Sequence, residues 1–163
     1  MVTMWDLRGA GTDNFKASDY AIQMDFPKYD AFVILSSDTF GETDKEIADK
    51  AMELGNPTFF AKTKMDSAMK NQKRKLKEEF DKDTEKKKVK QNIKKAVGLT
   101  NDDNIFLIVN LPPDDEDLLK DFPDNDNQKL QEKIVKSIQA IQKTAIGKTI
   151  SHDLNLGIKL KLY

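Results

Sequence analysis

The chain has no cysteine among its 163 residues, which excludes a disulfide scaffold and is typical of a reducing compartment. It also has no apolar run that approaches the roughly 20 residues needed to cross a bilayer; no run is longer than Ala31 to Leu35. The start of the sequence lacks the basic and apolar regions of a signal peptide and the Met-Gly of an N-myristoylation site. We therefore expect a single domain with its own hydrophobic core.

Little net charge is present, at −1, but the charge is distributed unevenly. Residues 62–95 hold fourteen basic and six acidic side chains, whereas residues 101–126 hold nine acidic side chains and one lysine. Two solvated faces are the ordinary interpretation. A basic surface for nucleic acid or acidic lipid is the sharper one, although it lacks the interleaved aromatic residues that stack on single strands. We expect no specific nucleic-acid partner.

Apolar runs alternate with helical patterns along the chain. We predict strands over Val2–Leu7, Tyr29–Ser37, Thr58–Ala61 and Asn104–Asn110. We predict a short helix within residues 13–26, another after the capping-box pattern at Thr43–Glu46, a lysine-rich helical stretch over 67–98 that breaks near Phe80-Asp81, and an amphipathic helix over 128–146. This order predicts an α/β fold, a mostly parallel sheet with crossover helices.

Polar loops follow three of the predicted strands, and parallel strands place such loops at one edge of the sheet, where open α/β sheets bind ligands. Thr63-Lys64-Met65-Asp66 fits T-K-x-D, in which a carboxylate accepts from N1–H and the exocyclic amine of guanine. Asp6-Leu7-Arg8-Gly9 fits D-x-x-G, in which the Asp holds Mg²⁺ and the Gly N–H approaches a phosphate. Taken alone, each motif is equally compatible with an ordinary strand end.

The order of several motifs carries more weight than any one of them. The sequence contains Trp5-Asp6-Leu7-Arg8-Gly9-Ala10-Gly11-Thr12, Phe40 with Asp44, Thr63-Lys64-Met65-Asp66-Ser67, Phe80-Asp81-Lys82, Ile105-Phe106-Leu107-Ile108-Val109-Asn110 and Asp121-Phe122-Pro123. In this order they resemble W-D-L-P-G-x-G-T, F-x-x-x-D, T-K-V-D-S, F-D-K, I-F-L-I-S-N and D-F-P of the immunity-related (interferon-inducible) GTPases. The resemblance covers roughly residues 2–143 and implies a small-GTPase-like G domain of the P-loop NTPase fold.

The resemblance also implies a set of site residues and ligands. Asp6 and Gly9 match the family's contacts to Mg²⁺ and the γ-phosphate. Thr63, Lys64 and Asp66 match its guanine readers, and Val109 and Asn110 match the last loop over the base. Val109 departs from the usual serine, and Ala10 offers no glutamine to orient water, so no catalytic residue is assigned. GTP or GDP with Mg²⁺, self-assembly, innate immunity and a cytoplasmic location, peripheral on intracellular membranes, are implied by the family.

The largest departure is the phosphate-binding loop. The family has a strand, a G-x-x-x-x-G-K-S loop and a helix before its W-D-L-P-G strand, and these 163 residues contain no such loop. On this interpretation the G domain is truncated, phosphate and Mg²⁺ binding are weakened or lost, and GTP hydrolysis stays an open question. Two alternative functions are therefore considered: a guanine-nucleotide-binding domain, and a non-enzymatic remnant that docks onto full-length relatives.

The end of the chain differs in pattern from the rest. We assign residues 1–146 to the partial G domain and 147–163 to a divergent tail. Leu154, Leu156, Ile158, Leu160 and Leu162 alternate with polar residues or glycine, which is the period of a strand. Either the tail pairs with a free sheet edge as a strand, or it is a partly disordered extension.

Overall fold

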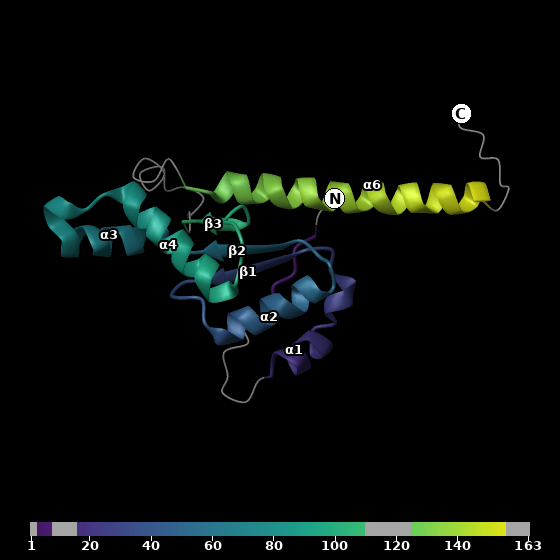
Figure 1. The fold of residues 1–163 in the computed structure, drawn as a ribbon, viewed down its shortest axis with the longest axis horizontal. Coiled ribbons are helices and arrows are strands. Elements are labelled where there is room, and N and C mark those ends of the chain that lie inside the picture. The colour runs from purple at the N-terminus through teal and green to yellow at the C-terminus, as the bar shows by residue number, and fades with distance from the viewer. Residues whose placement is uncertain (1–2, 8–15, 110–124, 156–163) are drawn as a thin grey trace.

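The computed structural model describes residues 3–7, 16–109 and 125–155, with the backbone alone over 145–155. At its centre, three parallel strands form one sheet in the order β1-β2-β3: β1 (Phe32–Ser36), β2 (Thr58–Lys62) and β3 (Ile105–Leu107). The register aligns Ile34 with Phe60 and Phe60 with Ile105. The predicted α/β fold with a parallel sheet is thus confirmed (Figure 1).

Helices cover both faces of this sheet (Figure 1). On one face, α2 (Glu42–Glu53) and α4 (Lys82–Val97) bury Ala48, Ile93 and Val97 against Phe60 and Ile105. On the other face, α6 (Asn127–Asn155) buries Leu130 against Phe59, Ala61 and Phe106. Because neighbouring strand residues point to opposite faces, Phe59 and Phe60 serve the two layers separately. The near-continuous apolar strands of the sequence are explained by this double cover.

A smaller cluster forms around the start of β1. Helix α1 (Ala17–Gln23) and the short 3-10 helix η1 (Phe26–Lys28) bring Tyr20 and Phe26 onto Phe32 and Ala51. The rings of Phe26 and Phe32 lie 4.6 Å apart, and Tyr20 meets Phe26 edge-on at 5.8 Å. This cluster fixes the amino-terminal end of β1, and Leu7 packs against it.

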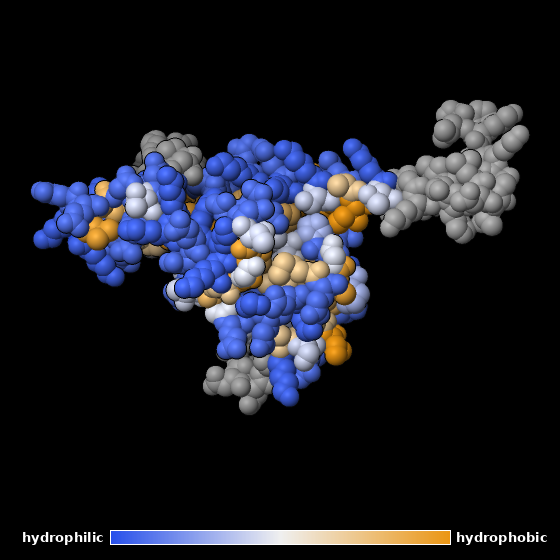
Figure 2. Space-filling model, viewed as in Figure 1, coloured by the Kyte–Doolittle hydropathy of each residue, from blue (hydrophilic) through white to orange (hydrophobic). Residues whose placement is uncertain are grey.

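The lysine-rich stretch forms an arm that projects beyond the edge of the sheet and returns to one face of the sheet through the end of α4 (Figure 1). It consists of α3 (Met65–Leu76), the 3-10 helix η2 (Lys77–Glu79) and α4, with a break at Phe80-Asp81 as predicted. Asp81 caps α4 by accepting a 2.7 Å hydrogen bond from the Thr84 N–H. The surface of the arm is predominantly hydrophilic (Figure 2).

The predicted cap of α2 is wrong by two residues. Helix α2 begins at Glu42 with Gly41 as its N-cap, and Gly41 N–H donates to Asp44 Oδ2 at 2.9 Å. Asp44 therefore serves as the acidic partner of the cap, whereas the sequence pattern had placed the cap at Thr43. The Asp44 side chain sets the start of α2, because it accepts from the Gly41 N–H, which has no partner within the helix.

The strand predicted over Val2–Leu7 is wrong in the part that the structure describes. Thr3–Leu7 has no regular secondary structure, and its backbone is absent from the three-stranded sheet. A strand is held by ladder hydrogen bonds to a neighbour, and none of the strands within residues 3–7, 16–109 and 125–155 pairs with this segment. Leu7 is nevertheless drawn to the Tyr20 cluster by its apolar side chain.

The last helix is longer than predicted. The sequence pattern placed it over 128–146, whereas α6 runs without a break from Asn127 to Asn155. Leu154, the first residue of the alternating tail, is therefore helical. The rest of that pattern, from Leu156 onward, lies outside the described residues, so the strand interpretation and the domain boundary at 146/147 stay predictions.

Candidate functional site

The loop that follows β2 is fastened to the last residue of β1. Thr63 N–H donates to the Ser36 carbonyl at 2.9 Å, and the Thr63 hydroxyl lies 3.4 Å from the same oxygen. The predicted role of Thr63, to pin this loop through its hydroxyl, agrees with that geometry. The start of the T-K-x-D stretch is thus anchored on one side.

The same loop is fastened on its other side to the chain beyond β3. Ile108 N–H donates to the Lys62 carbonyl at 2.9 Å, and Met65 N–H donates to the Ile108 carbonyl at 3.3 Å. Met65 is also buried in the core cluster that contains Val109. Because parallel strands end at one edge of the sheet, the two loops meet there as the sequence predicted.

Lys64 and Asp66 lie at the start of α3. Lys64 is the N-cap, exposed and in the left-handed region at φ 55° and ψ 34°. Asp66 is half-buried in the first turn, and one of its oxygens accepts a 3.1 Å hydrogen bond from the Ser67 hydroxyl. An ionised carboxylate offers about four lone-pair positions. Asp66 therefore retains acceptor capacity for a ligand with two adjacent N–H donors.

Val109 is held in the interior by a residue that sequence reasoning missed. Its backbone N–H donates to Asn127 Oδ1 at 3.1 Å, and Asn127 Nδ2 donates to the Val109 carbonyl at 3.0 Å. Val109 is 2% exposed. Asn127 begins α6, and its side chain continues the pairing that β3 leaves at Leu107. Asn110, the next predicted site residue, lies outside the described residues.

Asp126, also missed, is a buried carboxylate that completes this anchor. It accepts from Leu107 N–H at 3.0 Å through its side chain, and its own N–H donates to the Leu107 carbonyl at 2.9 Å. Lys129 lies 2.9 Å from one oxygen and Lys90 lies 3.8 Å from the other. The basic and acidic segments of the sequence therefore meet at least at this point, through Lys90 and Asp126.

Lys62 is the third residue that the sequence reading passed over. It ends β2, is 9% exposed, and its Nζ donates to the carbonyls of Ser37 and Thr63. Burial lowers the pKa of Lys62 below its ordinary value; nearby Asp38 acts in the opposite direction, and Lys64 adds to the lowering. A lysine that closes an apolar strand directly before T-K-x-D was the available signal.

Asp6 directly precedes Leu7, which packs against the Tyr20 cluster. It is exposed, and its charge acts on Tyr20, whose pKa is raised first by burial, then by Tyr29 and then by Asp6. Tyr20 belongs to the cluster at the amino-terminal end of β1, whereas Thr63–Asp66 follows the carboxyl end of β2. The expected shared edge therefore holds for the loops after β2 and β3. Residues 3–7 are not a strand, so the argument from parallel strands does not extend to Asp6, and its role at that edge stays a prediction. Gly9 lies outside the described residues.

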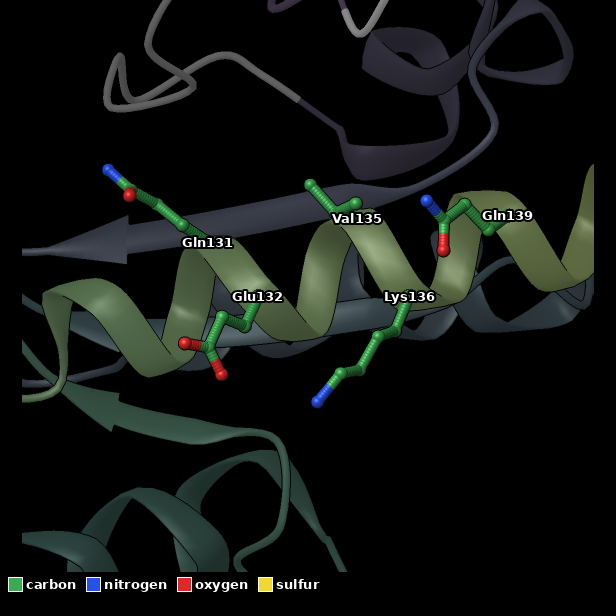
Figure 3. Close-up of a pocket in the computed structure, with 5 residues that line it drawn as sticks. All are labelled: Gln131, Glu132, Val135, Lys136 and Gln139. Atoms are coloured by element: carbon green, nitrogen blue, oxygen red, sulfur yellow. The ribbon is translucent and has the colours of Figure 1, made fainter.

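A shallow hollow on α6 offers no second site. Gln131, Glu132, Val135, Lys136 and Gln139 line it, and all five come from one helix (Figure 3). Gln131, Val135 and Gln139 project along one side of α6, and Glu132 and Lys136 along another (Figure 3). Since no second element forms an opposing wall, the hollow cannot enclose a ligand.

The fold and the joined loops define the class: an α/β domain with a parallel sheet, in which the loops after β2 and β3 meet at the carboxyl edge. The family model for interferon-inducible GTPases matches residues 1–161. The chain therefore belongs to the interferon-inducible GTPase family, as the motifs implied.

Curated relatives agree with this assignment. The mouse T-cell-specific guanine nucleotide triphosphate-binding protein 2 is 33% identical over 80% of this chain and 31% of its own length. Mouse interferon-gamma-inducible GTPase 10 is 40% identical over 45% of this chain and 18% of its own length. Rat interferon-inducible GTPase 5 is 30% identical over 69% of this chain and 25% of its own length. The chain thus spans less than a third of each of these relatives.

Proposed function

We propose that this chain recognises the guanine base of GTP or GDP through the loop Thr63–Asp66, supported by the loop that contains Val109 and Asn110. The observation that carries the proposal is the pair of hydrogen bonds that join Lys62 and Met65 to Ile108. They make the two loops one rigid edge, and a binding site needs such support for its contacts.

The chemistry of Asp66 gives the proposal its specificity. Its carboxylate accepts from N1–H and the exocyclic amine of guanine, two donors that adenine does not present together. A site built to satisfy such donors rejects a base without them by about 10⁴-fold in favourable cases. Exposed Lys64 lays its stem along the base while its ammonium group remains in water.

Phosphate and metal chemistry is a separate matter. The 163 residues contain no G-x-x-x-x-G-K-S loop, whose amides and lysine hold the β- and γ-phosphates in P-loop proteins. Asp6 has a suitable oxygen donor for Mg²⁺, but it is exposed, and the next residue, Leu7, packs against the Tyr20 cluster. Across residues 3–7, 16–109 and 125–155, no three acidic, histidine or cysteine side chains gather to hold a metal. We assign no step of GTP hydrolysis to the described residues.

A titration of the 163-residue chain with fluorescent GDP tests base recognition. Asp66→Ala should abolish saturable binding, and ATP should not compete with GDP. Asp83→Ala is the matched control, since Asp83 is an exposed acid in the first turn of α4. Loss of binding in both variants, or competition by ATP, would contradict the proposal.

The alternative function, docking onto full-length relatives, has one observation in its favour. Leu35 is 59% exposed on β1, an outer strand of the described sheet, although its register partner Ala61 is fully buried. Outer strands with exposed apolar side chains are sites where another chain can pair. A chain that circular dichroism shows to be folded, but that does not bind GDP, would favour docking.

Membrane association is proposed from the family alone. No helix among the described residues is long and apolar enough to span a bilayer. Flotation with anionic vesicles in low and high salt tests the peripheral association. Binding through the basic α3–α4 arm should weaken steeply as salt screens the charges.

A further inference from the structure

Lys62 departs from its surroundings more than any other residue near the proposed site. It follows Thr58, Phe59, Phe60 and Ala61 in a strand whose five residues are all buried. Within the described part of the chain it is the one lysine in the buried class. Burial of an ammonium group is costly, and such departures from the local pattern are expected at functional positions.

Lys62 contacts all three chain segments at the carboxyl edge of the sheet. Its Nζ donates to the Ser37 carbonyl after β1 and to the Thr63 carbonyl after β2, the latter at 3.1 Å. Its backbone carbonyl accepts from Ile108 N–H after β3 at 2.9 Å. One residue therefore links the three segments that follow the strands.

The contact to the Thr63 carbonyl acts directly on Lys64. That carbonyl belongs to the peptide plane between Thr63 and Lys64, so its direction is coupled to the φ angle of Lys64. Lys64 has φ 55°, in the left-handed region that residues other than glycine rarely occupy. A fixed hydrogen bond to this peptide holds Lys64 there, and α3 with Asp66 begins at the next residue.

We propose that Lys62 is a positioning residue for guanine recognition: its ammonium group holds the Thr63–Lys64 peptide, and through it Lys64 and Asp66, in the geometry that meets the base. This proposal rests on the proposed function and deepens it. Lys62 itself touches no part of the base. Lys62 determines how well the Asp66 carboxylate aligns with both guanine donors, N1–H and the exocyclic amine.

The test compares GDP and IDP binding by wild type and variants of the 163-residue chain. IDP keeps N1–H but lacks the exocyclic amine, so the ratio of the two dissociation constants reports the alignment of Asp66. Lys62→Met keeps most of the stem and removes the ammonium group. It should weaken GDP binding about tenfold or more, as expected for loss of a charged hydrogen bond, and bring GDP and IDP affinities together. Lys75→Met, at an exposed position of α3, should change neither.

Guanine selectivity separates positioning from a merely structural role. Lys62→Met leaves the Ser37 and Thr63 carbonyls without this donor, so its urea midpoint should fall. A loss of folded chain alone would weaken GDP and IDP binding equally and leave the ratio of their dissociation constants unchanged. Lys62→Arg keeps the charge and should recover part of the selectivity. If Lys62→Met does not fold, Lys62→Gln, which keeps a donor without charge, should show the same loss in smaller measure.

The outcomes distinguish the two proposals. A wild-type chain that binds GDP, with unchanged GDP and IDP affinities in the folded Lys62 variants, overturns the positioning role alone. A wild-type chain that binds neither nucleotide overturns the proposed function and the positioning role with it.

Discussion

Asn127 pairs with Val109 in both directions, as a neighbouring strand would. It accepts from the Val109 N–H at 3.1 Å and donates to the Val109 carbonyl at 3.0 Å. β3 ends at Leu107, so the chain beyond it would otherwise leave these groups unsatisfied in the interior. The first residue of α6 therefore fixes the segment that leads into Asn110.

Replacement of Asn127 by alanine should destabilise the chain by about 1–3 kcal/mol, because two backbone groups of buried Val109 lose their partner. Urea unfolding followed by circular dichroism measures this change. Gln128→Ala, at an exposed position one residue later, is the matched control and should fall within about 0.5 kcal/mol of wild type. Equal midpoints for the two variants would show that Asn127 does not hold Val109.

The electrostatic effect of Asp6 on Tyr20 can be tested by titration. Burial, Tyr29 and Asp6 together raise the pKa of the Tyr20 phenol. Because Asp6 contributes a negative charge that opposes the phenolate, Asp6→Asn should lower the pKa of Tyr20, whereas Asp19→Asn on α1 should not. NMR detection of the Tyr20 ring resolves it from the other two tyrosines. An unchanged Tyr20 pKa in Asp6→Asn would place Asp6 elsewhere.

The lowered pKa of Asp81 should make the stability of the chain depend on pH. Its hydrogen bonds from Thr84 lower the pKa of this carboxyl below its ordinary 3.8. A group with a lowered folded-state pKa stabilises the fold above its unfolded value, and this contribution is lost as pH falls through the folded value. Asp81→Ala should therefore melt below wild type at neutral pH, and the difference should vanish well below pH 3.8. Asp83→Ala should show a smaller difference, and a constant gap for Asp81→Ala at every pH would contradict the cap.

Glycine substitutions at Lys77 and Lys75 should change the stability of the chain in opposite directions. Lys77 has φ 50° and ψ −113°, a backbone conformation that favours glycine, whereas Lys75 lies inside α3. Lys77→Gly should stabilise the chain by about 1 kcal/mol through relief of strain. Lys75→Gly should destabilise it by about 1 kcal/mol through lost helix propensity. Thermal unfolding of the two variants measures both, and a shift in the same direction would refute the strained turn.

Much of the fold was predictable because its signals are local. The apolar runs of β1, β2 and β3 and the break before Asp81 follow from periodicity and capping. The position of the T-K-x-D stretch at a strand end was predictable, because the stretch follows an apolar run and precedes a helical pattern. Its chemistry is a property of residue type and order, which the sequence carries directly.

Other features depended on partners distant in the chain. Thr3–Leu7 has the composition of a strand, but a strand requires a neighbour, and the described sheet supplies none. The hydrogen bond between Val109 and Asn127 joins residues 18 positions apart in the sequence. The hydrogen bond from Lys62 to the Ser37 carbonyl joins residues 25 positions apart. The sequence by itself determined the element types and the chemistry of the T-K-x-D loop. Tertiary structure alone decided which side chains anchor those loops, because hydrogen-bond partners across a sheet edge are fixed by packing and leave no periodic trace in the chain.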